Sequence, residues 1–419
     1  MKLKQLIHKI FSQARDTSFH AEYWDGEVIH YGPVAEPEFT VAFGSERRMR
    51  NLLDNVKLKI GEAYVAGELE VRGDLQRFVR LAHVLDVDAM ALSLSEKLSV
   101  AVMVLRQRNS LGKSKQNIVR HYDISNDFYK LWLDDDLVYS CGYFRSSDDD
   151  LHRAQAQKMA HLCAKLRLSP GARVLDVGCG WGGLAMYAAR YHAVEVTGIT
   201  LSEQQHIEAT RRVASRQLGA AVDIRIQDYR QLRPIRPFDR WVSVGMFEHV
   251  GKGFIDEYVR CITRQLRPGG LGVLHTMGRM AEGEMSPWLN KYIFPGLYLP
   301  SLAEIVDTLG RHGFNVIDVE NLRMHYGLTL DRWVERFEGK AGAIRNMFDE
   351  AFVRMWRLYL HSCAAAFKYG YANLWQITFT NGLVNDLPLT RDFLYTAAPP
   401  LSAQSPPGEA RGTSSLGLG

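Results

Sequence analysis

Arg173-Val-Leu-Asp-Val-Gly-Cys-Gly-Trp-Gly-Gly183 is the stretch of sequence that decides the fold. Valine and leucine lead into Asp176, glycines occupy positions 178, 180, 182 and 183, and residues 184–190 continue with apolar residues at helical spacing. This pattern predicts a buried strand, a glycine turn and a helix. Glycine permits positive φ and lets a ligand lie against the backbone, and the helix N-terminus offers free N–H groups. The turn is therefore a candidate ligand site.

The spacing of these glycines narrows the ligand only in part. It is G-x-G-x-G-G, with an acidic residue two positions before the first glycine. Dinucleotide enzymes use a similar spacing, so the motif alone is weak. It resembles the S-adenosylmethionine loop of class I methyltransferases, which implies contacts from Asp176, Gly178, Gly180 and Gly182. An ordinary strand-to-helix turn is the alternative.

Strands and helices alternate from the glycine loop to about residue 320, which predicts a doubly wound, mostly parallel α/β sheet. The expected strands are 174–177, 194–200, 222–227, 241–244, 271–275 and 316–322. Ligands of such sheets bind outside the carboxyl ends of the strands. Polar residues collect at these ends: Asp176, Thr200, Asp228, Glu248 and His275.

Two of these strand ends fit parts of a nucleoside. Thr200, Ser202 and Gln205 offer hydroxyl and amide groups that suit ribose hydroxyls, although Ser202 is also a candidate N-cap of the next helix. Asp228 and Tyr229 offer an acid and an aromatic face, which suit an adenine amine and ring; a surface loop is the alternative.

Glu248 and His275 follow the next two strands, in apolar surroundings. A carboxylate in such a place needs a partner, because desolvation is otherwise costly. A single histidine at a strand end is usually structural, but two polar ends on adjacent strands favour a site.

The rest of the chain suggests further organisation. Residues 1–110 read as an α+β domain, with an amphipathic helix at 2–15, strands at 22–31 and 39–43, a helix from Ser45, a turn-rich joint at 61–67 and a helix at 74–84. Residues 85–116 read as a helical connection that ends in a polar linker at 111–116. A second domain follows at 117–395, with a helical, aromatic-rich stretch at 325–375. Residues 396–419 read as a disordered tail.

Composition bounds the class of protein. The chain has 419 residues, enough for two or three domains, and a formal net charge of +4, which does not argue for a nucleic-acid partner. Five cysteines without a C-x-x-C pair argue against a disulfide framework or a zinc site, so we expect a cytoplasmic protein without a metal. No apolar run reaches the length of a membrane span.

An ordered set of motifs makes a family resemblance specific. They are HYDISNDFY at 121–129, YSCGYF at 139–144, the glycine loop, GITLSEQQ at 198–205, MFEHVG at 246–251, LHTMG at 274–278, NKYIFP at 290–295 and LPS at 299–301. The set resembles the cyclopropane-fatty-acyl-phospholipid synthase family over about residues 117–395. Residues 1–110 are also similar to the N-terminal domain of the longer bacterial members.

The resemblance implies a reaction and residue roles. Members transfer the methyl group of S-adenosylmethionine to a cis double bond of a phospholipid acyl chain, and hold a bicarbonate ion near the reacting methyl group. The positions that match cofactor contacts are Tyr139, Ser140, Gly178, Gly180, Thr200, Ser202, Gln205, Asp228 and Tyr229. Those that match bicarbonate contacts are Cys141, Glu248, His275 and Tyr326, with the backbone at Met277, where the family usually has isoleucine. Cys363 matches a cysteine once regarded as the nucleophile.

The chemistry of the reaction agrees with these roles. An alkene is a weak nucleophile, so the methyl donor must be a strong electrophile, as a sulfonium is. One proton must leave the new methyl group before a ring closes, which requires a nearby acceptor and a dry pocket. Tyr143, Phe144, Trp181 and the aromatics of 288–298 are candidates for an aromatic lining that stabilises cations, or they are plain core. A covalent route through Cys363 is less attractive, because nothing near it in the sequence lowers its pKa.

Several alternatives stay open at this stage. A relative could stop at a methyl-branched acyl chain or methylate another small molecule, and a different class is a catalytically inactive membrane lipid-binding protein. Because the substrate chain lies in a bilayer, we expect reversible, peripheral binding to the inner face of the membrane, aided by Lys2, Lys4, Lys9 and Arg15. The alternative for the helix at 2–15 is that its apolar face packs on its own domain. A homodimer is also open.

Overall fold

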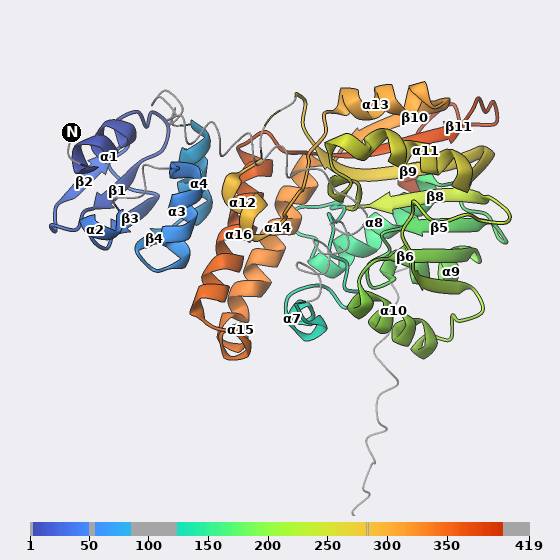
Figure 1. The fold of residues 1–419 in the computed structure, drawn as a ribbon, viewed down its shortest axis with the longest axis horizontal. Helices are drawn as coiled ribbons and strands as arrows, with labels where there is room; N and C mark the ends of the chain where they lie inside the picture. Colours follow the sequence, from blue (N-terminus) through green and yellow to red (C-terminus); the bar gives the residue numbers. More distant parts are fainter. Residues whose placement is uncertain (1–2, 50–54, 85–123, 282, 284, 397–419) are drawn as a thin grey trace, which may run out of the picture.

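The computed structural model describes residues 3–49, 55–84, 124–281, 283 and 285–396. Figure 1 shows a small N-terminal α/β domain at one end, a large sheet with its helices at the other, and long helices between them. The central helices are α14 (Arg323–Gly339), α15 (Ala341–Met347) and α16 (Glu350–Lys368). The predicted connection at 85–116, its linker and the tail at 397–419 lie outside the described residues, so these boundaries stay predictions.

The large sheet has seven strands in the order β10-β11-β9-β8-β5-β6-β7. Neighbours from β9 to β7 run parallel, and β11 runs antiparallel to both of its neighbours. The prediction of a doubly wound, mostly parallel sheet is confirmed. The strand bounds are β5 (Arg173–Val177), β6 (Glu195–Thr200), β7 (Val222–Ile226), β8 (Phe238–Val244), β9 (Leu266–Gly278), β10 (Phe314–Asn321) and β11 (Asn373–Asn381).

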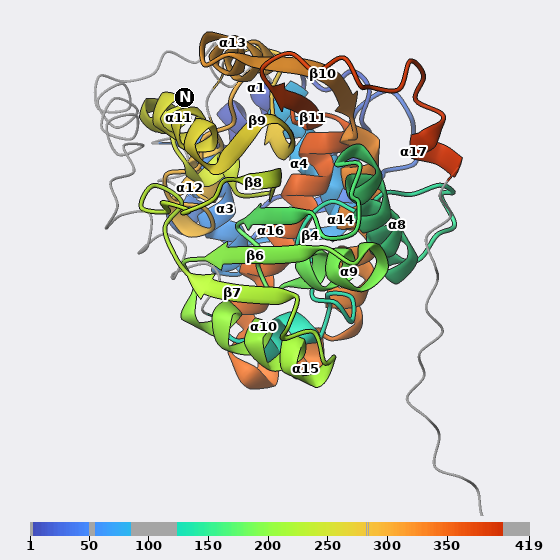
Figure 2. The same cartoon turned by 90° about the vertical axis from the view of Figure 1, so that its right-hand side faces the viewer.

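Helices cover both faces of this sheet, as Figure 2 shows. Side chains alternate along the strands, so Val174, Val242 and Val273 pack under one set of helices, while Leu175, Trp241 and Leu274 pack under the other. The first set is α8 (Leu151–Lys165), α9 (Gly183–His192) and α10 (Glu203–Ser215). The second set is α11 (Ile255–Gln265) and α13 (Leu302–Arg311). Asp176 and His275 belong, by the same alternation, to the α8 face.

Strand β11 was not predicted. The expected helical stretch at 325–375 ends inside it, although the helices stop at Lys368 and Asn373 already pairs with Gly278. Every residue from Asn373 to Thr380 is buried. β11 places Gln376 opposite His275 in the register of the sheet.

The N-terminal domain has a four-stranded sheet in the order β2-β1-β3-β4. Its elements are α1 (Leu3–Phe11), β1 (Phe19–Glu22), β2 (Val28–Tyr31), β3 (Phe39–Phe43), α2 (Glu46–Met49), α3 (Val56–Val65), β4 (Leu69–Gly73) and α4 (Leu75–Val84). The single strand expected at 22–31 is wrong. The chain instead turns at Gly26, with φ +84°, and forms the antiparallel pair β1–β2.

Helix α1 packs on its own domain. Leu3, Ile7, Ile10 and Phe11 of its apolar stripe are buried in the core, and Lys4 forms ion pairs with acidic residues of the β1–β2 turn. The apolar face of this helix therefore packs on its own domain, which is the alternative to membrane binding given above.

The turn-rich joint expected at 61–67 is also wrong, because α3 continues to Val65. A Cβ at Gly61 would lie 2.4 Å from Cδ1 of Trp288, which belongs to α12 (Pro287–Tyr292). This glycine therefore admits an indole from the large domain rather than a bend. The neighbouring Glu62 binds Lys291 Nζ at 2.8 Å and Tyr292 Oη at 2.7 Å, which ties the two domains together.

Candidate active site

A pocket opens at the carboxyl ends of β5, β6 and β8, where the glycine loop leads into α9. Most of the residues predicted to bind the cofactor line it. They are Tyr139, Ser140, Asp176, Gly178, Gly180, Thr200, Gln205 and Tyr229. Gly182, Ser202 and Asp228 do not line it, and their positions are described below.

The glycine loop has the backbone geometry that its sequence requires. Gly178 and Gly180 have φ of +85° and +55°, values that other residues rarely adopt. A Cβ at Gly178 would lie 2.7 Å from Cβ of Met246, whereas a Cβ at Gly180 would meet no protein atom within 4 Å. Gly182, with φ +78°, is the N-cap of α9. Gly180 therefore presents bare backbone to the pocket.

Asp176 and Lys158 bring two opposite charges to the pocket wall. Asp176 is buried, and its Oδ2 has no hydrogen-bond partner. Burial raises the pKa of this carboxyl to about 7, against a smaller opposing effect of Lys158. Lys158 of α8 donates to Ser140 Oγ at 3.0 Å, and burial lowers its pKa to about 8. The sequence analysis missed Lys158, since a lysine in an ordinary helix gives no signal that it points inward.

Thr200, Ser202 and Gln205 form a local network at the end of β6. Thr200 Oγ1 donates to Gln205 Oε1 at 2.7 Å. Ser202 Oγ accepts a hydrogen bond from the backbone N–H of Gln205 at 3.2 Å. Ser202 is fully buried and caps α10. Its cap role is therefore observed, while Thr200 and Gln205 reach the pocket.

The carboxylate of Asp228 is bound by Arg230, which the sequence does not predict as a site residue. Arg230 donates from Nε to Asp228 Oδ1 at 3.0 Å and from Nη2 to Oδ2 at 2.7 Å. Arg230 and Tyr229 both line the pocket, with the guanidinium 5.4 Å from the ring centroid. Each carboxylate oxygen of Asp228 can accept further hydrogen bonds.

Glu248 and His275 are both fully buried, and each leaves one polar atom without a partner. Glu248 Oε1 accepts the Met277 amide at 2.5 Å, whereas Oε2 has no partner. Burial raises the pKa of Glu248 to about 7. Each side chain has its own partners: the Met277 backbone and the Thr276 side chain for Glu248, and Gln376 for His275. The Met277 amide, which the resemblance assigns to the ion, is held by Glu248.

The protonation of His275 follows from its neighbours. Gln376 Nε2 lies 3.1 Å from His275 Nδ1; in this orientation of the amide, Nδ1 accepts and the ring proton is assigned to Nε2, the atom without a partner. Burial lowers the pKa of His275 well below its usual value, and the ring is neutral at pH 7. A neutral histidine with Nε2–H is a hydrogen-bond donor toward a ligand.

Cys141, Tyr326 and Cys363 lie on or beside the long helices and pack in one hydrophobic cluster with Met277. Cys141 is buried and its Sγ donates to Gly142 O at 3.1 Å; the Gly142 amide donates to Thr329 Oγ1, one turn after Tyr326 on α14. The Tyr326 ring packs against Phe367, with centroids 4.6 Å apart. Burial raises the pKa of the Cys363 thiol to about 12, so this thiol is not a thiolate at neutral pH.

Aromatic rings continue from the pocket toward the long helices. Tyr139 Oη lies 2.7 Å from Tyr359 Oη, the Tyr359 ring lies 5.4 Å from Phe294, and Phe294 lies 6.1 Å from His249, another pocket residue. Burial lowers the pKa of His249 to about 4, which keeps this ring neutral. Among the predicted lining residues, Phe294 and Trp181 are therefore beside the pocket.

The other predicted aromatics have different neighbours. Tyr143 stacks between His161 and His325, with centroid distances of 4.3 and 4.7 Å, and Phe144 also packs near His325. Trp288 packs against α3 of the N-terminal domain. These three residues do not line the cofactor pocket, and their place in an aromatic lining stays a prediction.

Comparisons with known proteins show the family of this chain. Residues 109–377 match the family described as mycolic acid cyclopropane synthetase, and residues 6–90 match a domain of unknown function. A probable fatty acid methyltransferase of Pseudomonas putida is 39% identical over 381 residues, which cover 89% of this chain and 95% of that protein. The cyclopropane-fatty-acyl-phospholipid synthase of Escherichia coli K12 is 43% identical over 272 residues, covering 65% and 69%.

Among solved structures, the mycolic acid cyclopropane synthase CmaA1 in complex with SAH and CTAB has a TM-score of 0.60 and 33% identity. The match covers 64% of this chain and 98% of that one.

Proposed function

Because the chain belongs to the mycolic acid cyclopropane synthetase family, we propose that it methylates the cis double bond of an unsaturated phospholipid acyl chain and closes a cyclopropane ring. The chain is an S-adenosylmethionine-dependent methyltransferase of lipid acyl chains. Over the proposed reaction, the acyl chain gains one methylene and one proton is released. The phospholipid class and the ring rest on the resemblance and on the site described above.

The main support for a cofactor site in this pocket is that Asp176 Oδ2 is buried without a partner and that Gly180 exposes its backbone in the same pocket. A buried polar atom without a partner is rare, and an amino group would satisfy it. Thr200 and Gln205 offer polar groups, and Tyr229 offers an aromatic face, on the other strand ends of the same pocket. When bound there, S-adenosylmethionine supplies a methyl group on a sulfonium, which is electrophilic enough for an alkene.

The proton acceptor is the finer part of the proposal. Glu248 Oε2 and His275 Nε2 are two buried atoms without partners, one an acceptor when ionised and the other a donor. A bicarbonate ion, which carries both a hydroxyl donor and acceptor oxygens, fits such a pair. Glu248 would accept from it and His275 would donate to it, while the Met277 amide fixes the Glu248 carboxylate. The rival is that Glu248 itself takes the proton, with no ion present.

Glu248→Gln separates these roles from cofactor binding. We expect turnover to fall by about 10²- to 10⁴-fold, the range of general-base assistance, with little change in cofactor affinity. In buffer depleted of carbon dioxide, the parent enzyme should lose activity and regain it with added bicarbonate. Undiminished activity in that buffer would assign the proton to Glu248.

The identity of the product is tested directly. Purified protein is incubated with S-adenosylmethionine and vesicles of unsaturated phospholipid, and the acyl chains are analysed by mass spectrometry. A gain of one methylene with loss of the double bond supports the cyclopropane. A methyl-branched chain supports the second candidate, an enzyme related to the probable fatty acid methyltransferase. No product, with cofactor binding absent in calorimetry, supports an inactive lipid-binding protein.

Reversible binding to the inner face of the membrane is proposed because the acyl substrate lies in a bilayer. No helix in the part of the chain that the structure describes is long and apolar enough to cross a membrane. Because the apolar stripe of α1 is buried, this helix can attract an anionic surface through its basic side chains but not through its apolar ones. Each basic residue near such a surface contributes about 1 kcal/mol to binding. Lys4 contributes less, since it is paired with Asp25 and Glu27.

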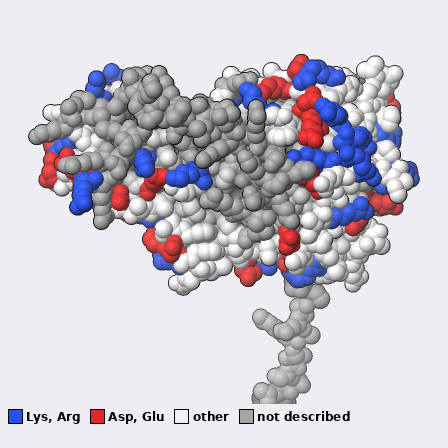
Figure 3. Space-filling model, viewed as in Figure 1, with Lys and Arg blue, Asp and Glu red and all other residues white. Residues whose placement is uncertain are grey.

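Some of the charges at the other end of the molecule are paired. On the face in Figure 3, Lys and Arg side chains gather over the sheet end, with acidic side chains beside them. Arg267 pairs with Asp239 and Arg260 with Asp256, so this end offers a weaker attraction than its arginines suggest. Sedimentation with anionic vesicles, at low and high salt, compares the parent with a variant in which Lys2, Lys4, Lys9 and Arg15 are glutamine. Equal binding would remove α1 from the proposal.

A further inference from the structure

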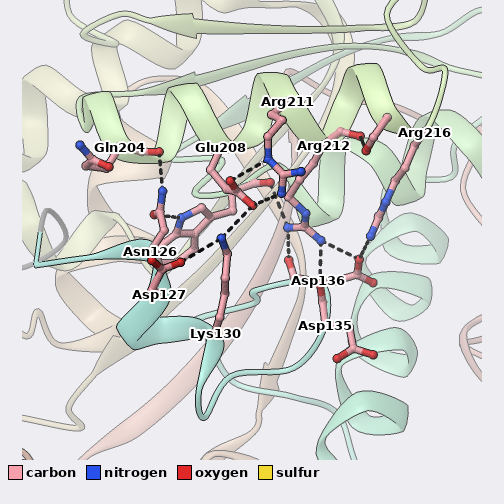
Figure 4. Close-up of polar contacts among 12 residues, drawn as sticks. Asn126, Asp127, Lys130, Asp135, Asp136, Gln204, Glu208, Arg211, Arg212 and Arg216 are labelled. Atoms are coloured by element: carbon pink, nitrogen blue, oxygen red, sulfur yellow. Dashed lines mark hydrogen bonds and ion pairs between the residues drawn. The ribbon is translucent and has the colours of Figure 1, made fainter. Parts of the chain in front are cut away.

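Residues 126–140 form a strip of chain that leads onto the cofactor pocket, and we call it the cover strip. It begins with α7 (Asn126–Lys130) and ends with Leu137, Val138, Tyr139 and Ser140, which line the pocket. Figure 4 shows that polar side chains of α10 point toward this strip. The cover strip and α10 are separated by about 75 residues of sequence, so their contacts are long-range.

Arg212 makes the densest of these contacts. Its Nη1 donates to Asp136 O at 2.7 Å and to Trp181 O at 3.3 Å. Its Nη2 donates to Asp135 O at 3.0 Å and to Asp136 Oδ1 at 3.0 Å. The side chain is only 7% exposed. One buried guanidinium thus joins the cover strip to the glycine loop, to which Trp181 belongs, and the rigid fork of arginine suits several oxygens at once.

The backbone that Arg212 holds is unusual. Leu137 has φ +53°, a left-handed value that costs free energy for a residue other than glycine. Asp134 stabilises the turn locally, because its carboxylate accepts the amides of Asp136 at 3.1 Å and Val138 at 2.8 Å. Arg212 binds the two carbonyls immediately before Leu137. These bonds therefore set the direction in which residues 138–140 enter the pocket wall.

A second attachment lies at the other end of the strip. Trp181 Nε1 donates to Asn126 Oδ1 at 2.8 Å, and Asn126 Nδ2 donates to Gln204 O at 3.3 Å. The contacts of Lys130 with Asp127 and Glu208 are longer, at 3.4 and 3.6 Å, and more exposed. Asp136 also accepts from Arg216 Nη2 at 2.6 Å. Of these contacts, those of Arg212 are the most numerous, and they bind the backbone immediately before the pocket-lining residues 137–140.

We propose that Arg212 is a positioning residue for the cofactor: it fastens the cover strip to the glycine loop and so keeps one wall of the pocket closed against the bound molecule. This inference rests on the cofactor site proposed above. Arg212 does not line the pocket and acts through residues 137–140 and Trp181. Its loss should speed cofactor dissociation more than it slows association, since the closed wall opposes escape.

The experiment compares Arg212→Met with Arg211→Met. Arg211 is the adjacent residue on α10, 64% exposed, and among the described residues its ion-pair partner is Glu208 on the same helix. Binding of S-adenosylhomocysteine is measured by calorimetry, and its dissociation rate by stopped-flow tryptophan fluorescence. We expect Arg212→Met to raise Kd by about 10- to 100-fold, mostly through faster dissociation, and Arg211→Met to match the parent. Arg212→Lys should recover only part of the loss, because an ammonium cannot reach four oxygens in the same way.

Two further measurements separate positioning from general damage. Amide hydrogen exchange without ligand should quicken at residues 135–140 in Arg212→Met and stay at the parent rate in β5. Asp136→Asn, which keeps the backbone acceptors, should give a smaller increase in Kd. A folded Arg212→Met with the parent Kd, dissociation rate and exchange would overturn the proposal; if that variant does not fold, Arg212→Lys is judged by the same criteria. If the parent itself binds no S-adenosylhomocysteine, the proposed function fails instead.

Discussion

Single side chains at the strand ends decide what the pocket can bind, and Asp176 is the clearest case. Its Oδ2 is buried without a partner, and burial raises its pKa from 3.8 to about 7. Near neutral pH, part of the protein therefore carries Asp176 in the neutral form. A cationic amino group stabilises the ionised form, so binding and proton release are linked.

We predict that cofactor affinity rises with pH through about 7 and then levels off, because the ionised Asp176 is the form that binds. Calorimetry with S-adenosylhomocysteine from roughly pH 6 to 8 measures the trend. Asp176→Asn should bind more weakly, with that step in the pH profile removed. If the asparagine variant keeps the pH profile of the parent, another group controls binding.

The glycine loop allows a prediction with a close control. Gly180 and Gly171 both have left-handed φ, +55° and +76°, and a Cβ at either would meet nothing within 4 Å. Valine at either position carries the same kind of backbone strain, of order 1–3 kcal/mol. Only Gly180 lines the pocket. Gly180→Val should therefore abolish cofactor binding, while Gly171→Val should lose similar stability in thermal denaturation and still bind.

For single residues, the sequence predicts the polar side chains at the strand ends but not the basic side chains that contact them. Thr200, Gln205 and Tyr229 were found because parallel strands bring their carboxyl ends to one edge. Lys158 and Arg230 were missed, since their roles depend on which way a helix or loop side chain points. That direction is set by tertiary packing, which a single sequence does not display.

Among the elements, β11 fits closely against β9. A Cβ at Gly272 of β9 would lie 2.4 Å from Cζ of Phe379, so the ring occupies the space that a side chain at this position would need. We predict that Gly272→Ala destabilises the protein by about 1–3 kcal/mol through overpacking. Chemical denaturation measures the change. Phe379→Leu in the same background should reduce the penalty, as expected for two residues in contact.

Replacing Gly310 by alanine should change the free energy of unfolding in the opposite direction. This residue lies in α13, and a Cβ there would meet nothing within 4 Å. Gly310→Ala should therefore stabilise by about 0.5–1 kcal/mol through helix propensity. Equal effects at both positions would contradict the packing argument for β11.

The predictions of helices and strands are wrong where a pattern fits two structures. A glycine occurs both in turns and at close helix contacts, and a buried apolar run occurs both in helices and in strands. The sequence around Gly61 predicts a turn-rich joint, but Gly61 lies inside a helix and contacts Trp288. The strand pattern of Ile377, Thr378 and Phe379 follows a long helical stretch, and the helix was extended into it. The six strands around the glycine loop were recovered because their alternation with helices repeats.

For the whole molecule, Arg354 of α16 joins the two domains. It donates from Nε to Tyr64 O at 2.6 Å and from Nη2 to Leu69 O at 3.0 Å, and its Nη1 lies 2.8 Å from Glu70 Oε1. Removing it leaves two buried carbonyls without this donor, at roughly 1–3 kcal/mol each.

We predict that Arg354→Met quickens hydrogen exchange across residues 56–73 and lowers thermal stability, while the Kd for S-adenosylhomocysteine stays unchanged. Arg345→Met is the control, since Arg345 makes an exposed pair with Glu350. A parallel loss of cofactor affinity would show that docking of the N-terminal domain also shapes the pocket.

The position of β11 also governs when this protein can fold during its synthesis. Among the described strands, β10 pairs with β11 alone, and His275 meets Gln376 only when β11 is in place. The roughly 95 residues between β9 and β11 take about 5–20 s to translate at ordinary rates. Throughout that time the emerging chain carries β9 with one unpaired edge, a surface that invites other strands. A ribosome that stalls before residue 373 would therefore release a product with its central sheet open, which chaperones and proteases can tell apart from the finished enzyme.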